Sequence, residues 1–293
     1  MEKSLLDSGL IRQLEALELV VRRLHAGRTR GERRSRRRGQ GSEFADYRDY
    51  AQGDDLRFID WNIYGRLDRL FLRLFHEEED LRLAIWIDSS ESMGFGDPEK
   101  LGYAKRVAAA LAYVALCTQD RVTIEASNSG RLDLMRPLRG KQQLVRMLEF
   151  LDGVRAAGET DLERGLKAFS MRNAAPGMKI AVSDFLDKGG FTTPLRWLTQ
   201  GRSEPVAIHV LSPQEVEPDL SGDLTLEDAE DGSRVDVSMG QTLLRSYRKS
   251  VEALCGNLRE YSRARGISYF FAQTKVPLEE LILRAMRGKG VLR

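Results

Sequence analysis

Five oxygen-bearing side chains at three places in the sequence have the types and spacing of a site for a hard divalent cation. Asp88, Ser90 and Ser92 alternate in the segment DSSES, Thr160 lies in GETDL, and Asp184 lies in SDF. Carboxylate and hydroxyl oxygens are ligands that suit Mg²⁺ or Mn²⁺. Alternate side chains of a tight loop can turn toward one point, so the first three can share one ion. The sequence therefore predicts a metal site made of these five residues.

Two strongly apolar segments lead into these carboxylates and predict buried strands. Residues 81–88 (LRLAIWID) and 178–185 (MKIAVSDF) are almost continuously apolar, as expected for strands covered on both faces of a parallel sheet. After the first, Asp97-Pro98 predicts the start of a long helix that runs to about Thr118. Helices and strands continue to alternate, which predicts a doubly wound, mostly parallel α/β sheet. Ligand sites of such sheets lie at the carboxyl ends of the strands.

Each of the three places also has an ordinary structural interpretation. A serine-rich turn after a strand is often only a loop, Thr160 with Glu163 has the spacing of a capping box, and Asp184 could cap a turn. Taken singly, these features do not favour a metal site. Together they occur in order at the ends of predicted elements, and this combination favours the metal interpretation.

The same residues resemble the metal-ion-dependent adhesion site (MIDAS) of von Willebrand factor A domains. The Asp88-x-Ser90-x-Ser92 spacing, Thr160 in a G-x-T-D-L setting and Asp184 after a buried strand are similar to that family's motif. The resemblance implies a Rossmann-like fold in which the two serines bind Mg²⁺ (or Mn²⁺) directly. It implies that the threonine binds directly or through water and that the aspartates act mostly through water. We expect a protein partner's acidic residue to complete the coordination.

A second resemblance covers most of the chain, from about residue 27 to the C-terminus. Residues 41–66, with the elements GDD (53–55) and IDW (59–61), followed by DSSESM, are similar to the domain-of-unknown-function 58 family of bacterial proteins. Longer members add membrane helices and a β-rich domain ahead of this region, where this sequence has a short amphipathic helix. The resemblance implies partnership with a MoxR-type AAA+ ATPase or its client, in protein maturation, metal insertion or complex assembly.

These patterns predict two parts of the chain. Residues 1–78 form an N-terminal helical and irregular extension, which holds an amphipathic helix over 5–26, an arginine-rich loop and the GDD/IDW segment. Residues 79–293 form the von Willebrand factor A-like domain. Residues 214–239 interrupt that domain as a small acidic hairpin insertion.

The charges are unevenly distributed, although the net formal charge is only +2. Seven arginines lie between Arg28 and Arg38, and eight acidic residues lie between Glu215 and Asp231, where Asp231-Gly232 predicts a hairpin turn. The arginine-rich loop leaves a nucleic-acid-binding alternative open, because its guanidinium groups would neutralise phosphates. The chain has no recognised nucleic-acid motif, so nucleic acid is the less favoured partner.

The GDD/IDW segment is expected to have a structural role, with direct binding of a partner as the less favoured alternative. Trp61 is expected in a core rather than on a contact surface. The charged residues are expected to form a buried ion-pair network that fastens the segment to the sheet: Asp54, Asp55, Arg57, Asp60 and Arg66.

The remaining sequence features favour a cytoplasmic binding module over an enzyme or a membrane protein. The chain has neither a phosphate-binding G-x-x-x-x-G-K-[ST] loop nor a G-x-S-x-G nucleophile elbow, and its three histidines are scattered. Metal-assisted hydrolysis is the least favoured alternative, because the site lacks an evident general base. No stretch approaches the roughly 18 apolar residues that span a bilayer. The N-terminus lacks a signal-peptide pattern, and Cys117 and Cys255 are expected to be reduced.

Overall fold

The computed structural model describes residues 5–17, 44–75 and 81–292, which belong to two compact units. One unit comprises residues 1–27 and 81–293, and the other comprises residues 28–80. The N-terminal helix thus groups with the sheet, whereas the sequence placed it in an extension ending at residue 78. The arginine-rich loop, and the nucleic-acid alternative that depends on it, lie outside the described residues.

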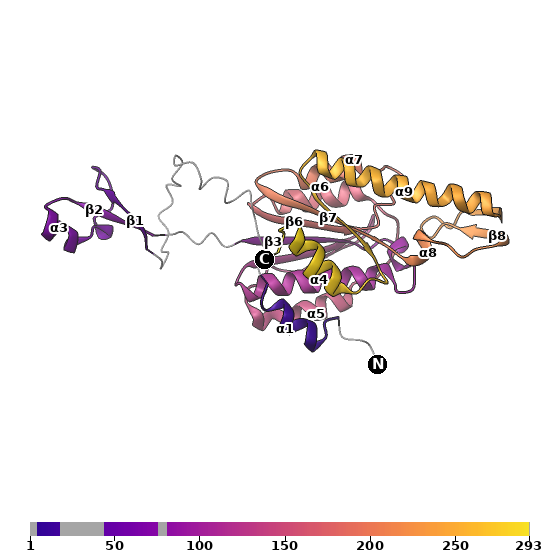
Figure 1. The fold of residues 1–293 in the computed structure, drawn as a ribbon, viewed down its shortest axis with the longest axis horizontal. Coiled ribbons are helices and arrows are strands. Elements are labelled where there is room, and N and C mark those ends of the chain that lie inside the picture. The colour runs from indigo at the N-terminus through magenta and orange to yellow at the C-terminus, as the bar shows by residue number, and fades with distance from the viewer. Residues whose placement is uncertain (1–4, 18–43, 76–80, 293) are drawn as a thin grey trace. The chain divides into compact units, whose positions relative to one another are not determined.

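A six-stranded sheet forms the centre of the larger unit (Figure 1). Its strand order is β10-β7-β6-β3-β4-β5, and all neighbours are parallel except β4 and β5. In this doubly wound order the chain adds β4 and β5 beside β3 toward one edge of the sheet, and then β7 and β10 beside β6 toward the other edge. The predicted α/β class is confirmed. The strands are β3 (Arg82–Asp88), β4 (Arg121–Ser127), β5 (Leu132–Leu134), β6 (Gly177–Ser183), β7 (Ser203–Leu211) and β10 (Ser268–Gln273).

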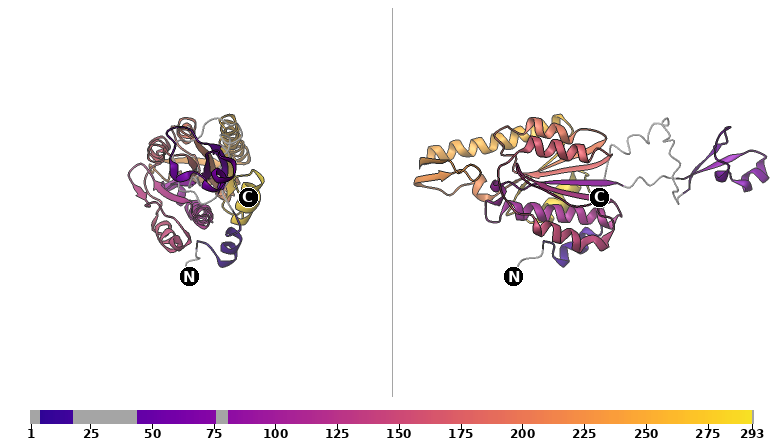
Figure 2. Two further views of the ribbon diagram at one scale, coloured as in Figure 1. Left: turned by 90° about the vertical axis from the view of Figure 1, so that its left-hand side faces the viewer. Right: turned by 180° about the vertical axis from the view of Figure 1, so that it is seen from behind.

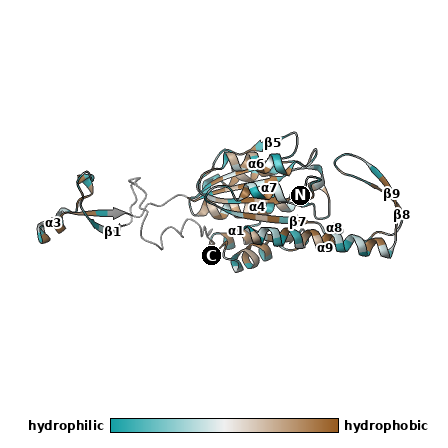
Figure 3. Cartoon of the chain, turned by 90° about the horizontal axis from the view of Figure 1, so that it is seen from above, coloured by the Kyte–Doolittle hydropathy of each residue, from teal (hydrophilic) through white to brown (hydrophobic). Residues whose placement is uncertain are grey.

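The central strand β3 contributes to two hydrophobic cores, because successive side chains of a strand point to opposite faces. Leu83, Ile85 and Ile87 belong to one core, and Ala84 and Trp86 belong to the other. Figure 3 shows hydrophobic colour along the strands and mixed colour on the surrounding helices. This burial on both faces explains why the strand is almost continuously apolar.

Helices cover both faces of the sheet (Figure 2). The first core lies under α1 (Ser8–Leu14), α4 (Lys100–Cys117), α5 (Leu144–Gly153) and a π-helical turn (Glu280–Met286). The second lies under α6 (Leu162–Arg172), α7 (Thr192–Leu198) and α9 (Gln241–Ala264). Among the described residues, no helix has the length and apolar character needed to cross a bilayer.

The N-terminal helix α1 packs on its own domain. Leu10 and Leu14 are buried in the first core. Just beyond the helix, Glu15 accepts hydrogen bonds from the Tyr113 hydroxyl of α4 (2.9 Å) and from Lys141 (3.0 Å). The amphipathic spacing of this segment therefore reflects packing against α4.

The predicted acidic hairpin is present between α8 (Pro213–Val216) and α9. Its strands β8 (Gly222–Glu227) and β9 (Arg234–Met239) are antiparallel and mostly exposed. At the tip, Asp228 accepts hydrogen bonds from the backbone N–H groups of Glu230 (2.8 Å) and Asp231 (3.3 Å). Gly232 has a φ of 69°, a conformation that favours glycine.

The smaller unit pairs β1 (Phe44–Asp49) with β2 (Phe71–Phe75) in antiparallel register. Between them lie a 3₁₀ turn (Leu56–Phe58) and the helix α3 (Trp61–Leu67). Trp61 is 61% exposed, so it lies outside the core of this unit, contrary to the expectation.

Four ion pairs join residues within the described part of the smaller unit: Arg48 to Asp54 (2.8 Å), Arg57 to Asp55 (2.9 Å), Arg69 to Asp49 (2.9 Å) and Arg73 to Asp60 (2.8 Å). Of the five residues expected in a buried ion-pair network, Asp54, Asp55, Arg57 and Asp60 do form ion pairs, but not all of them are buried. Arg57 is exposed, and Arg66 has no ion pair within the described part of the chain. Arg73 lowers the pKa of Asp60 to about 2.

Candidate functional site

The carboxyl ends of β3 and β6 lie side by side at the centre of the sheet, with Ile87 paired to Val182. The chain then turns from β3 to α4 on one face and from β6 toward α7 on the other. Loops that diverge in this way leave a crevice at the point where the strand order reverses, which is where doubly wound folds bind ligands. The structure places Asp88 at the end of β3 and Asp184 directly after β6.

Asp88 is a buried carboxylate with hydrogen bonds to both of its oxygens. Its Oδ1 accepts from the Ser90 backbone N–H (3.0 Å), and its Oδ2 accepts from the Ser183 hydroxyl (2.7 Å). Burial, and next the nearby charge of Asp184, raise the pKa of Asp88 to about 7, although both hydrogen bonds oppose the shift. A positive charge at this point would therefore favour the ionised form.

The loop after β3 brings the hydroxyls of Ser90 and Ser92 together. Their Oγ atoms are 3.1 Å apart. In an octahedral Mg²⁺ shell with metal–oxygen distances of about 2.0–2.1 Å, adjacent ligand oxygens lie about 2.9 Å apart. The two hydroxyls thus have the separation of two neighbouring ligands of one ion.

The loop that carries Thr160 is fastened to the loop after β3. The backbone N–H of Glu91 donates to Gly158 (2.8 Å), and that of Ala157 donates to Ser89 (3.0 Å). The helix that follows is capped by Asp161, not by Thr160, so the capping-box interpretation of Thr160 is wrong.

The partner of Thr160 is Glu230, at the tip of the β8–β9 hairpin. The Thr160 backbone N–H donates to Glu230 Oε2 (3.0 Å), and the Thr160 hydroxyl donates to Glu230 Oε1. A carboxylate of the chain itself therefore contacts one of the five predicted site residues.

Asp184 is fully buried and pairs with a buried lysine. Lys100 Nζ, at the start of α4, donates to Asp184 Oδ2 (2.6 Å) and to Glu215 Oε1 (2.5 Å). Burial alone would lower the pKa of Lys100, but the charges of Asp184 and Glu215 outweigh it and raise that pKa. Lys100 therefore remains protonated and partly neutralises the carboxylates of the site.

These residues fit a divalent ion in part. Ser90, Ser92 and the buried pair Asp88 and Asp184 supply oxygen donors and unbalanced negative charge. Lys100 already supplies one positive charge to Asp184. Among the described residues, no three His, Cys, Asp or Glu side chains gather in a way that could hold a metal ion. An ion at this site would therefore depend on the hydroxyl oxygens.

Three residues of the site were not predicted from the sequence: Lys100, Glu215 and Glu230. Lys100 could have been noticed, because it is in helical phase with buried residues of α4 such as Ala104 and Val107. Glu215 and Glu230 belong to an acidic segment in which all carboxylates look alike. Only the tertiary fold distinguishes them.

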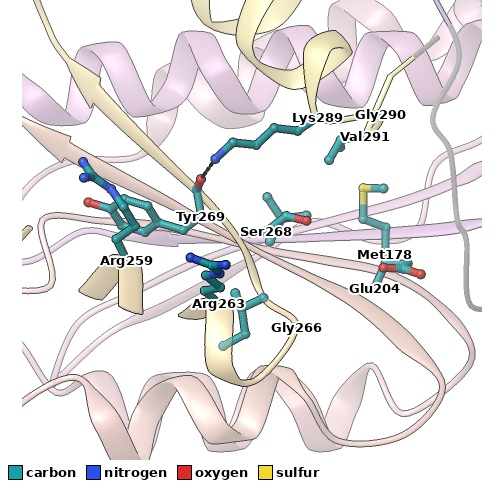
Figure 4. A pocket seen from close by; sticks show the side chains of 12 residues that line it. Met178, Glu204, Arg259, Arg263, Gly266, Ser268, Tyr269, Lys289, Gly290 and Val291 are labelled. Atoms are coloured by element: carbon teal, nitrogen blue, oxygen red, sulfur yellow. Dashed lines mark hydrogen bonds between the residues drawn. The ribbon is translucent and has the colours of Figure 1, made fainter. Parts of the chain in front are cut away.

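A separate cavity of about 500 Å³ lies at the amino ends of β6, β7 and β10, opposite the candidate site (Figure 4). It is lined by Met178, Glu204 and Ser268, from the beginnings of β6, β7 and β10, and by Arg263 and Lys289. The lining residues that the structure describes include none of the five candidate residues. The cavity therefore takes no part in the site at the carboxyl ends.

Comparisons with known proteins place the chain among uncharacterized bacterial relatives. A family model described as "Protein of unknown function DUF58" matches residues 46–254. Uncharacterized proteins of Mycobacterium bovis and Mycobacterium tuberculosis are each 29% identical over 253 residues, which cover 84% of this chain and 79% of the relative. An uncharacterized protein of Mycobacterium avium is 30% identical over 128 residues, or 43% of this chain and 70% of that protein.

Solved structures with similar architecture share little sequence with the chain. The conserved hypothetical protein BatB from Bacteroides thetaiotaomicron is 16% identical with a TM-score of 0.44, over 66% of this chain and 90% of that one. The SpRpn10 VWA domain is 9% identical with a TM-score of 0.40, over 69% of this chain and 93% of that one. Both TM-scores are below 0.5, so the description of the fold rests on the strand order itself.

Proposed function

The chain belongs to the DUF58 family, and we propose that it is a protein-interaction module that binds a partner's carboxylate in the presence of Mg²⁺ or Mn²⁺. The observation that carries the proposal is the pair of hydroxyls of Ser90 and Ser92. They lie 3.1 Å apart on the loop that follows the buried carboxylate of Asp88. Neutral hydroxyls leave a bound ion with much of its charge, and this favours an anionic ligand from outside.

Each candidate residue has a definite role in this proposal. Ser90 and Ser92 would hold the ion directly, and Thr160 would contribute its hydroxyl directly or through water. Asp88 and Asp184 would accept hydrogen bonds from coordinated water and so orient it. A bound divalent ion would supply the positive charge that Asp88 lacks and a coordination position open to a carboxylate.

The partner is proposed from the family resemblance. A MoxR-type AAA+ ATPase, or one of its clients, would present an Asp or Glu to the site in the cytoplasm. Loss of that carboxylate should weaken binding by about 2–5 kcal/mol, as for charge pairs at other interfaces. We propose binding rather than catalysis, because the histidine that the described residues place beside Asp184 is poorly suited to act as a base. His209 is buried, its Nδ1 lies 2.9 Å from the Tyr269 hydroxyl, and burial lowers its pKa to about 4.

Metal binding is tested first, with the metal alone. Mn²⁺ binding is measured by electron paramagnetic resonance and Mg²⁺ binding by calorimetry, on the wild type and on the double variant Ser90→Ala, Ser92→Ala. We expect the double variant to lose binding of both ions. Ser89→Ala is the matched control, because Ser89 is also buried in this loop but lies out of phase with Ser90 and Ser92. Equal metal binding by all three proteins would contradict the proposed site.

Partner binding is tested second, with a purified MoxR-type ATPase from the same source. Co-sedimentation is measured with Mg²⁺ and with EDTA, for the wild type and for the double serine variant. The proposal expects a complex only for the wild type with Mg²⁺. A complex that ignores both EDTA and the substitutions would show that this partner binds elsewhere.

A further inference from the structure

The tip of the β8–β9 hairpin already places a carboxylate at the candidate site. Glu230 receives two hydrogen bonds from Thr160, one from the backbone N–H and one from the hydroxyl. Thr160 lies just before the eleven-residue helix α6, whose N-terminal end favours negative charge. The contact therefore has the hydrogen bonds and the favourable charge of a specific carboxylate-binding site.

A second contact holds the same tip. Lys188, in the loop after β6, donates to Asp231 Oδ2 (2.6 Å) and lies 3.6 Å from Asp228 Oδ2. That loop also reaches α6, because Asp187 accepts from the Leu162 backbone N–H (2.9 Å). The two adjacent acids Glu230 and Asp231 thus meet Thr160 and Lys188 respectively.

The rest of the hairpin is held mainly by its own cross-strand contacts. The residues of β8 and β9 are mostly exposed, and their side chains pair across the hairpin, as Arg234 does with Glu227 (2.8 Å) and Ser238 with Asp223. The tip can therefore be released from the site without breaking the hairpin itself. The cost is two hydrogen bonds at Thr160 and the exposed ion pairs of Lys188.

We propose that the hairpin tip is an internal ligand of the site, with Glu230 in the place that a partner's carboxylate takes. This inference rests on the proposed function, because it assumes that the partner's carboxylate binds at Thr160, where Glu230 now lies. A partner must displace the tip, and a partner segment with the same carboxylates as the tip would do so most effectively. The tip thus indicates the partner's binding segment: an exposed acidic turn with a glutamate followed by an aspartate, read by Thr160 and Lys188.

The experiment uses the tip itself as the probe. A labelled peptide with residues 227–234, cyclised to hold the turn, is titrated by fluorescence anisotropy into the full-length protein with Mg²⁺ and with EDTA. In the wild type the tethered tip competes for the site at high effective concentration. The Glu230→Gln protein should therefore bind the peptide about tenfold or more tightly than the wild type does.

Three controls separate recognition from charge. A peptide that carries the Glu230→Gln change should not bind the Glu230→Gln protein. The Glu227→Gln protein loses an equally acidic residue of the hairpin that faces Arg234, and it should behave as the wild type. Adding Lys188→Gln to the Glu230→Gln protein should weaken peptide binding, because the aspartate of the probe loses its partner.

The outcomes distinguish this inference from the proposed function. Two results would contradict the internal ligand and leave the metal site unaffected. One is equal peptide binding by the wild type and the Glu230→Gln protein. The other is peptide binding by neither protein while Mn²⁺ still binds at Ser90 and Ser92. Tight peptide binding by the Glu230→Gln protein that persists in EDTA, without Mn²⁺ binding, would retain the internal ligand and overturn the metal dependence.

Discussion

Lys100 Nζ lies 2.6 Å from Asp184 Oδ2, and the two side chains are 1% and 0% exposed. The lysine also reaches Glu215, at 2.5 Å. An internal cation thus stabilises part of the negative charge gathered at the carboxyl ends of β3 and β6. Asp88 has no such cation among its hydrogen-bond partners, which are Ser90 and Ser183. The protein's own charges therefore neutralise the site only in part.

Replacing Lys100 should make the fold depend on a divalent cation. Lys100→Met leaves Asp184 buried without its charge partner, so the free energy of unfolding in EDTA should fall by about 3–5 kcal/mol. Mg²⁺ should restore more stability to this variant than it adds to the wild type. Urea unfolding with Mg²⁺ and with EDTA measures both effects.

Lys179→Met is the matched control for this prediction. Lys179 is also buried, but its Nζ donates to the Gln200 backbone carbonyl (3.1 Å), and burial lowers its pKa. Its replacement removes a buried lysine without exposing a carboxylate of the site. We expect the Mg²⁺ response of this variant to match that of the wild type, and an enlarged response would contradict the assignment to Asp184.

Asp88→Asn should change the pH dependence of the metal-free protein. The pKa of Asp88 is about 7 in the folded state against 3.8 ordinarily, so the folded protein holds this proton more tightly than the unfolded chain does. The contribution of Asp88 to stability is therefore greatest below about pH 4 and is lost as the pH rises to about 7. An asparagine does not ionise, so the variant should lose less stability over this range.

The measurement is urea unfolding in EDTA at several pH values, with the wild type and Asp88→Asn side by side. The asparagine oxygen can still accept from the Ser90 backbone N–H, which preserves the loop. Mg²⁺ should reduce the pH dependence of the wild type and leave that of the variant unchanged. Parallel pH profiles of the two metal-free proteins would refute the raised pKa.

Gly165→Ala should destabilise the packing of α6 on the sheet. A Cβ at Gly165 would lie 2.9 Å from Trp86 Cζ2 and 3.3 Å from Ser127 Oγ. The indole cannot easily move, because its Nε1 donates to Ser127 Oγ (2.8 Å) in the core. We expect a loss of about 1–3 kcal/mol from overpacking, larger than the roughly 1 kcal/mol that alanine gains in a helix.

Gly256→Ala is the control, because Gly256 also lies within a helix, α9, but an added Cβ there meets nothing within 4 Å. That variant should be unchanged or more stable by up to about 1 kcal/mol. Thermal unfolding of both variants measures the difference. A neutral Gly165→Ala would mean that α6 shifts freely, and with it the loop of Thr160.

The strands were predictable because burial on both faces leaves a continuous apolar run, as in residues 81–88, which contain β3 (Arg82–Asp88). The start of α4 was not. Asp97-Pro98 has the pattern of a helix start, yet α4 begins at Lys100 and no side chain caps it. The backbone of Asp97 instead exchanges hydrogen bonds with the Gln214 side chain, at 3.3 and 3.1 Å. A contact between distant segments thus overrides a local signal.

In the candidate site, too, the contacts between residues near in sequence were predictable and those between distant residues were not. Asp88, Ser90 and Ser92 occupy one turn, so their spacing alone predicts that they gather. Lys100 and Glu230 reach Asp184 and Thr160 across 84 and 70 residues of sequence. Their partners depend on the strand order and on how the hairpin folds back. Such contacts become visible only in the folded chain.

The buried histidine of β7 should make the protein sensitive to acid. Burial lowers the pKa of His209 to about 4 from its ordinary 6.5, against the opposing charge of Asp184. The unfolded chain therefore takes up this proton first, and stability is lost as the pH falls from about 6.5 to about 4. A shift of this size corresponds to about 3 kcal/mol.

His209→Asn should lower stability at every pH, because it leaves space among the rings of Phe185, Tyr269 and Phe271. The diagnostic readout is therefore the slope of stability against pH between about 6.5 and about 4, which should become shallower. Tyr269→Phe removes the hydroxyl that lies 2.9 Å from His209 Nδ1 but retains the buried imidazole, so it should keep the slope. Acid unfolding of the three proteins decides the matter: a slope that survives in His209→Asn would assign the acid sensitivity to carboxylates instead.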